Sequence, residues 1–186
     1  PTMFSQDDQQ KVIYLNTFSK SLAPSLRISY MVLPKPLMEL YEKQLSFYSC
    51  SVSSFEQYTL AKFISKGYFE RHINRLKRHY RKRKELFVQA IQDSPLATVC
   101  DVQKCQVGTH LVLQMHTRLS ELEIHQKAQE QGIHLALMSD YCRIPSLAYS
   151  RQVIINFASI DPEQIPLAVH LLVQIFQTDI DLKKNS

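Results

Sequence analysis

The sequence predicts an α/β layer that is followed by a smaller α+β unit. Two β-branched and aromatic runs near the N-terminus, a long amphipathic helix in the middle, and a mixture of strand and helix patterns in the second half favour this class. With 186 residues, the chain has room for one domain or two small ones. We expect the end of an α/β domain over residues 1–65, a long basic connecting helix over 66–92, and a small domain over 93–182.

The first part of the chain predicts two strands and two helices. Lys11–Leu15 and Arg27–Leu33 are short apolar runs, and the second has the composition of a buried strand. Apolar residues at helical spacing predict a helix over Lys35–Phe47. A second helix follows, for which Ser53 or Ser54 can serve as the N-cap.

The longest predicted helix covers about Tyr68 to Gln92 and has an apolar stripe on one face and a basic cluster on the other. Nine basic residues and one acid, Glu70, lie between Lys66 and Lys84. That segment therefore carries a formal charge of +8, which leaves −3 for the rest of the chain. A solvated helix face explains the cluster most simply. Contact with a DNA backbone or with a DNA-binding domain is the open alternative.

Three segments of the second half have strand patterns: Gly108–Met115, Ile133–Met138 and Val153–Ala158. Between the first two, Ser120 and Glu123 form a capping-box pattern for a helix that ends at Gly132. A last helix is expected to begin with Pro162 in its first turn. The polar tail DIDLKKNS is expected to fray.

Composition excludes several classes of protein. Hydrophobic residues make up 45% of the chain and charged residues 21%, which is typical of a globular protein and not of a disordered one. No stretch approaches the length of an apolar membrane span, and no secretion signal is visible at the N-terminus. Three glycines are too few for a Gly-rich phosphate loop or a dinucleotide fingerprint.

Cysteine and histidine spacings predict neither a disulfide framework nor a metal site. None of the four cysteines belongs to a CxxC pair, so we expect reduced thiols in a cytoplasmic protein. Cys100 and Cys105 are expected to be surface thiols near a strand turn. No Cys/His spacing matches a zinc site, and no bound metal is predicted.

The segment from Thr17 to Arg27 has the residues best suited to chemistry. Lys20 lies between hydroxyl side chains, in a polar loop between two apolar strands, and Arg27 follows seven residues later. Hydroxyls and a guanidinium together can bind a phosphate. A lysine beside another cation can act as a Schiff-base nucleophile, because the neighbouring charge lowers its pKa. The alternative is an ordinary exposed loop lysine among turn serines.

The string TFSKSLAPSLRISYMVLP closely resembles the lysine motif of fold-type I aminotransferases. More narrowly, it resembles the aminotransferase-like domain of MocR-type regulators of the GntR family. The resemblance continues through SVSSFEQYTLAKFISKGYFERHINRLKRHYRKRKELF, GTHLVLQ and VIINFASIDPEQI, and so covers nearly the whole chain. It implies the C-terminal part of a large domain that binds pyridoxal 5′-phosphate, followed by an aminotransferase small domain.

By this resemblance, Lys20 would form a Schiff base with pyridoxal 5′-phosphate, and Thr17, Ser19 and Arg27 would bind the phosphate. Family members hold the pyridine ring with residues upstream of the lysine, and only 19 residues precede Lys20 here. We therefore expect a C-terminal piece of a longer cytoplasmic, homodimeric regulator. The whole regulator would bind DNA through a winged-helix domain outside this chain and sense the cofactor or its amino-acid adduct.

One departure from the family's pattern leaves catalytic turnover open. In active aminotransferases an arginine three residues before the Phe of the FA pair binds the substrate carboxylate, and that position is Ile154 here. Arg151 and Arg143 are candidate replacements, although three residues along a strand is about 10 Å and reverses the face. Three functions stay open: an effector-sensing part of a regulator, an amino-acid aminotransferase, and a nucleic-acid-binding module that uses the basic helix.

Overall fold

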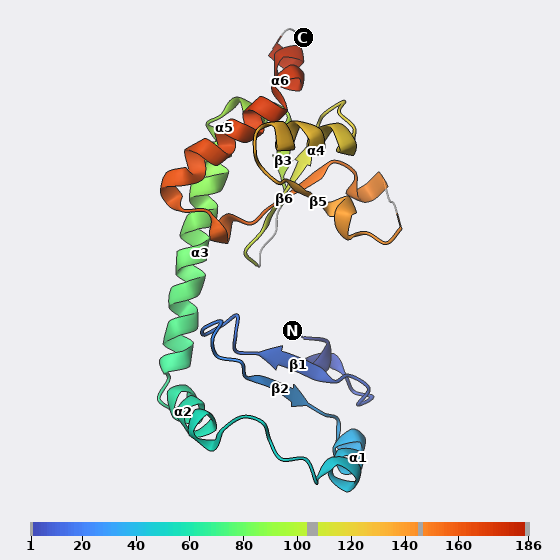
Figure 1. The fold of residues 1–186 in the computed structure, drawn as a ribbon, viewed down its shortest axis with the longest axis vertical. Coiled ribbons are helices and arrows are strands. Elements are labelled where there is room, and N and C mark those ends of the chain that lie inside the picture. The colour runs from blue at the N-terminus through green and yellow to red at the C-terminus, as the bar shows by residue number, and fades with distance from the viewer. Residues whose placement is uncertain (1, 104–107, 145–146, 185–186) are drawn as a thin grey trace. The chain divides into compact units, whose positions relative to one another are not determined.

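The structure is a computed structural model that describes residues 2–103, 108–144 and 147–184 (Figure 1). The chain divides into two compact units, residues 1–76 and 77–186, and the border falls inside the long helix. The predicted borders near residues 65 and 92 stay predictions.

In the first unit, strands β1 (Tyr14–Thr17) and β2 (Ser29–Val32) form an antiparallel hairpin with Thr17 opposite Ser29 (Figure 1). Both strands are shorter than predicted. The expected burial of the second strand is wrong, because all four residues of β2 are exposed. Its apolar composition suits a strand covered on both faces, whereas this two-stranded sheet lacks such cover in the described residues. Ile28 and Pro34 are the only buried residues described in the unit.

Helices α1 (Lys35–Leu45) and α2 (Ser54–Ser65) follow the hairpin, and neither contains a buried residue. Pro36 lies in the first turn of α1, where its missing N–H breaks no helical hydrogen bond. Of the two candidate caps of α2, Ser53 is the one used: its hydroxyl accepts the backbone N–H of Glu56 at 3.3 Å.

Helix α3 spans Tyr68–Gln92, as predicted. Gly67, which has a left-handed backbone (φ +71°), separates it from α2. At its C-terminal end Phe87 and Ile91 are buried in the core of the second unit. After the end of α3, Ser94 caps a short 3-10 turn over Pro95–Thr98.

The second unit contains an antiparallel sheet of four strands in the order β3-β4-β6-β5. Their bounds are Cys100–Val102 (β3), Leu111–Met115 (β4), Ala136–Leu137 (β5) and Gln152–Ile155 (β6). Alternate residues of β4 are buried, so one face of the sheet forms the core. Residues of α3, α4 and α5 fill that core.

The structure differs from the predicted strands in three places. β3 was not predicted, and β5 has only two residues. β6 ends at Ile155 and not at Ala158, because the backbone leaves the extended region at Asn156 and forms a 3-10 turn over Phe157–Ser159. Ile154 therefore remains within the strand, and Phe157 is buried just beyond its end.

Both predicted ends of helix α4 (Glu121–Glu130) are confirmed. Ser120 and Glu123 form the capping box, and hydrogen bonds from Ser120 lower the pKa of the Glu123 carboxyl. At the other end Gly132 has φ +70°, and the N–H of Ile133 reaches the carbonyl of Ala128 at 3.0 Å. This is the Schellman arrangement that favours glycine.

Helix α5 (Ile165–Ile175) follows a 3-10 turn that Pro162 begins, and α6 (Gln177–Lys184) ends the described chain. The expectation that the tail frays is wrong: Asp179 and Ile180 are buried. Among the described residues no single helix is long and apolar enough to cross a membrane. One pair of consecutive helical segments, 162–175 and 177–183, is long and apolar enough together, but the two segments are bent by 73° relative to each other.

Candidate functional site

The hairpin of the first unit holds the hydroxyl residues of the lysine motif. Thr17 is the last residue of β1, and its hydroxyl donates to the carbonyl of Ile28 at 3.1 Å. The hydroxyl of Ser19 donates to the carbonyl of Leu26 at 2.6 Å. These bonds join the two sides of the loop, so Thr17 and Ser19 are fixed relative to the returning chain that carries Arg27.

Thr17 and Ser19 also contact each other. Their hydroxyl oxygens lie 3.3 Å apart, and the backbone N–H of Ser19 donates to the Thr17 hydroxyl at 3.3 Å. Beyond them the chain turns back, because the N–H groups of Ser21 and Leu22 donate to the carbonyl of Phe18. The two hydroxyls are half-buried and mark the base of the loop.

Lys20 and Arg27 are both exposed and lie on the two sides of this loop. No ion pair is recorded for either of them within the part of the chain that the structure describes. The loop therefore combines two exposed cations, which can donate to a phosphate dianion, with two hydroxyls whose hydrogens are donated to carbonyls of the returning chain. Each hydroxyl would have to turn away from its carbonyl to donate to a phosphate.

This donor set fits the phosphate and the aldehyde of pyridoxal 5′-phosphate, but it does not hold the pyridine ring. The carboxylate of Asp7, one of the acids that precede the motif, accepts the N–H of Val12 at 2.6 Å and that of Gln9 at 3.2 Å. It is thus committed to its own loop. Phe18 packs against Tyr30 and Phe69, with ring centroids 5.3 and 5.8 Å away.

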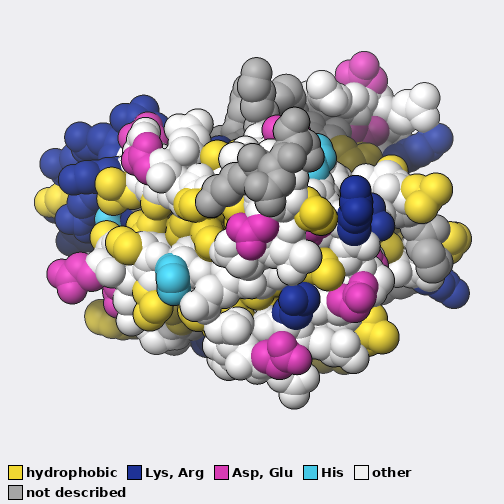
Figure 2. All heavy atoms as spheres, turned by 90° about the horizontal axis from the view of Figure 1, so that it is seen from above, with side chains coloured by type: hydrophobic (Ala, Val, Ile, Leu, Met, Phe, Trp, Pro, Cys, Tyr) yellow, Lys and Arg dark blue, Asp and Glu magenta, His cyan; other side chains and the backbone are white. Residues whose placement is uncertain are grey.

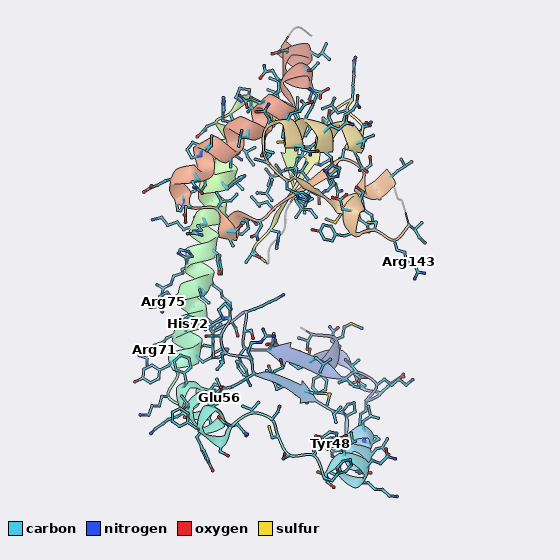
Figure 3. The ribbon with its side chains drawn as sticks, viewed as in Figure 1. Tyr48, Glu56, Arg71, His72, Arg75 and Arg143 are labelled. Atoms are coloured by element: carbon cyan, nitrogen blue, oxygen red, sulfur yellow. The ribbon has the colours of Figure 1, made fainter. Side chains whose placement is uncertain are left out.

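The positions discussed for a substrate carboxylate lie in the second unit. Ile154 is in β6 and pairs with Val112 on one side and Ala136 on the other. Arg151 precedes β6 with a left-handed backbone (φ +59°), and its N–H donates to the carboxylate of Glu121 at 3.0 Å. Arg143 is exposed on a loop and points away from the sheet (Figure 3).

A polar pocket of about 470 Å³ lies beside the ends of β4 and β6, and the sequence did not predict it. Arg151 lines it together with Arg118 and His116. The pairing of β4 with β6 brings these residues together, although more than 30 positions separate Arg118 from Arg151. His116 is held by Asp101, whose carboxylate lies 2.6 Å from Nε2.

The N-terminal part of α3 adds an ordered polar cluster to the first unit. The guanidinium of Arg71 lies 4.6 Å from the ring centroid of Tyr68, which is a cation–π distance. Arg75 Nη2 lies 3.5 Å from Nδ1 of His72, and the three side chains come from adjacent turns (Figure 3). Nε2 of His72 is buried without a hydrogen-bond partner in the described structure.

One of the two thiols that were predicted at the surface lies within the described residues. Cys100 is buried and not at the surface as expected, and burial raises the pKa of its thiol to about 11. It therefore stays protonated at neutral pH. Cys105 lies outside the described residues. Within residues 2–103, 108–144 and 147–184 no group of His, Cys, Asp and Glu is arranged to hold a metal ion.

Comparison with known proteins shows the family to which this chain belongs. Residues 2–172 match the family model for aminotransferase class I and II. The chain is 35% identical over 166 residues to the uncharacterized HTH-type transcriptional regulator YdeL of Bacillus subtilis, which covers 89% of this chain. It is 32% identical over 177 residues, 95% of the chain, to the probable rhizopine catabolism regulatory protein MocR of Rhizobium meliloti. The chain spans 35% of the length of each of these relatives.

Solved structures agree on the fold. The kynurenine aminotransferase of Pyrococcus horikoshii matches 94% of this chain with a TM-score of 0.73 and 22% identity, and the aminotransferase Aro9 of C. albicans matches 98% with a TM-score of 0.79 and 18% identity. In both cases the chain covers 43% of the other protein. The predicted fold class, a partial fold-type I large domain followed by a small α+β domain, is confirmed.

Proposed function

We propose that this chain, which belongs to the aminotransferase class I and II family, is the pyridoxal-phosphate-binding, effector-sensing part of a bacterial MocR-type transcription regulator. The relatives named as HTH-type regulators, of whose length this chain spans 35% and 36%, support the regulator assignment. The whole regulator would bind DNA through a domain outside this chain. It would act in the cytoplasm as a homodimer, as the resemblance to MocR-type regulators implies.

The observation that carries the proposal is the loop between β1 and β2. Lys20 is the amine that would hold the cofactor covalently, and Arg27 would hold its phosphate together with Thr17 and Ser19. The hydrogen bonds to the carbonyls of Leu26 and Ile28 hold both hydroxyl oxygens at the base of the loop, and each hydroxyl would exchange its carbonyl for a phosphate oxygen when the ligand binds. When bound, the cofactor supplies an electron sink that no protein side chain offers.

The residue at the expected carboxylate position supports sensing over turnover. Ile154 is apolar and pairs with Val112 and Ala136 in the sheet, so it offers no hydrogen bond to a carboxylate. Arg151 lies three positions earlier, just before β6 begins, and three residues along a strand is about 10 Å. A regulator needs only a ligand that binds two conformations with different affinity, and it does not need a catalytic cycle.

The proposal is tested by titrating the 186-residue chain with pyridoxal 5′-phosphate and recording the visible absorbance spectrum. We expect a saturable visible band for the wild type and for Lys11→Ala, a control that removes another exposed lysine of the first unit. Lys20→Ala should abolish the band. Arg27→Ala should raise the apparent Kd about tenfold, because a phosphate would lose a charged hydrogen-bond donor.

A band of equal intensity in Lys20→Ala and in Lys11→Ala would contradict the assignment, because it would show modification of surface lysines in general. No band in any of the proteins would show that the loop alone does not hold the cofactor.

A further inference from the structure

The basic face of α3 is a surface that the proposed cofactor function does not use. Four exposed cations, Arg71, Arg75, Arg78 and Lys82, recur at intervals of four, three and four residues. At 3.6 residues per turn, these positions form one stripe along the helix. The stripe extends about 16 Å at 1.5 Å per residue. We call it the basic stripe.

The basic stripe lies on the opposite side of α3 from its apolar residues. Phe69, Ile73, Leu76, Tyr80 and Phe87 follow the helical period about half a turn away, and each of them is buried or half-buried. The four cations therefore lie on the face of α3 opposite its apolar residues. Figure 2 shows a group of Lys and Arg side chains (dark blue) gathered together at the left of the view.

Acidic residues do little to balance this face. Between residues 66 and 92 the sequence has two acids, Glu70 and Glu85. Glu85 lies 3.8 Å from Nε of Arg81, outside the stripe. Arg83 is also outside it: its guanidinium donates to the carbonyl of Ala158 at 2.6 Å. The stripe thus consists of exposed cations, whereas Arg83 is used within the second unit.

Repulsion within the basic stripe costs the helix a little stability. Like charges four residues apart destabilise a helix, and the stripe contains two such pairs, Arg71 with Arg75 and Arg78 with Lys82. The rest of the chain carries −3, so the positive charge is not a general property of the protein. A bound polyanion would remove the repulsion.

We propose that the basic stripe binds the phosphate backbone of double-stranded DNA without reading its sequence. Over about 16 Å a duplex presents roughly ten phosphate charges at one per 1.7 Å, so each of the four cations has phosphates within reach along the helix. Arginine and lysine are the side chains that make such contacts. The inference rests on the regulator part of the proposed function, since such a regulator works on DNA, and it does not involve the cofactor loop.

The test measures binding of a fluorescently labelled duplex of 20 base pairs and random sequence to the 186-residue chain, by anisotropy between 50 and 200 mM NaCl. Four phosphate contacts predict a slope of about −3.6 for the logarithm of the association constant against the logarithm of salt. The variant Arg71→Gln/Arg75→Gln/Arg78→Gln/Lys82→Gln should bind at least tenfold more weakly at 50 mM and have a slope near zero, since each lost contact reduces the slope by about one.

The matched control is Lys11→Gln/Lys35→Gln/Lys43→Gln/Lys62→Gln, which removes the same charge from exposed lysines elsewhere. It should keep both the affinity and the slope of the wild type. Circular dichroism of both variants checks that the helices are intact.

Three results would overturn the proposal: no binding by the wild type at 50 mM, an equal loss in both variants, or an unchanged slope in the stripe variant. Displacement of the labelled duplex by poly-glutamate at a much lower concentration of charge than an unlabelled duplex requires would show a surface for acidic proteins and would also overturn it. None of these results affects the Lys20 titration, so the two proposals fail separately.

Discussion

Asp179 is the single residue whose role differs most from the prediction. It lies in α6, in the tail that was expected to fray, yet its carboxylate is buried. One oxygen accepts the hydroxyl hydrogen of Thr117, and the other accepts the N–H of Arg118 at 3.1 Å. The bonds join α6 to the segment between β4 and α4, so one carboxylate orders the C-terminal helix.

We predict that Asp179→Ala lowers the free energy of unfolding by about 2–3 kcal/mol, because two hydrogen bonds to a buried carboxylate are lost and the hydroxyl hydrogen of Thr117 loses its acceptor. Asp181→Ala is the matched control on the same helix: Asp181 is exposed and accepts from the side chain of Gln177. It should change stability by less than about 0.5 kcal/mol. Urea unfolding followed by circular dichroism measures both, and equal effects would contradict the role given to Asp179.

Helix α3 has a structural role and a proposed binding role. Different residues serve the two roles. Arg83 is half-buried and bonds to the carbonyl of Ala158, in the turn that ends β6. Its second partner, Asp161, is exposed and lies 3.6 Å away, so that ion pair adds little. The contact with Ala158 is what holds the turn against the helix.

Arg83→Ala should therefore reduce the stability of the second unit by about 2 kcal/mol, through the lost bond and the lost packing of its aliphatic stem. Lys77→Ala, which removes an exposed cation from the same helix, should change it by less than about 0.5 kcal/mol. Thermal unfolding of both variants, at equal protein concentration, compares them. A larger loss in Lys77→Ala would show that the net charge of α3, and not the contact with Ala158, controls stability.

For the whole molecule, the distribution of buried residues is the dominant feature. All members of the described hydrophobic core lie in residues 77–186, where α3, α4 and α5 cover one face of the four-stranded sheet. In residues 1–76 the helices α1 and α2 bury nothing, and large apolar side chains such as Phe47 and Phe55 are 74% and 81% exposed. Apolar surface on this scale favours association with other protein surfaces.

Hydrogen exchange of the isolated chain should follow this distribution. The amides of β4, β6 and α5 should exchange slowest, because opening them requires unfolding of the core, whereas those of α1 and α2 should exchange within the first time points. Mass spectrometry of peptic fragments measures both groups. Comparable protection in α1 and α5 would show that the first unit is covered, for example by a second copy of the chain.

Local features of the sequence determined a large part of this protein. The bounds of α3, the cap Ser120 and the turn at Gly132 were all predictable, and the cap of α2 was narrowed to Ser53 or Ser54, because each depends on the local pattern of the sequence. The lysine motif was equally visible, since its residues occupy one short loop. The family assignment rested on it and is confirmed, while the roles of Lys20 and Arg27 stay predictions.

Only the tertiary structure decided the features that depend on distant segments. The burial of Cys100 and Asp179, the existence of β3 and the pocket beside Arg118 and Arg151 all arise from contacts between residues far apart in the sequence. A short strand or a polar tail has no periodicity of its own, so its state depends on which surface it meets. The exposure of β2 shows the same principle: an apolar run can specify a strand, but burial requires a covering layer.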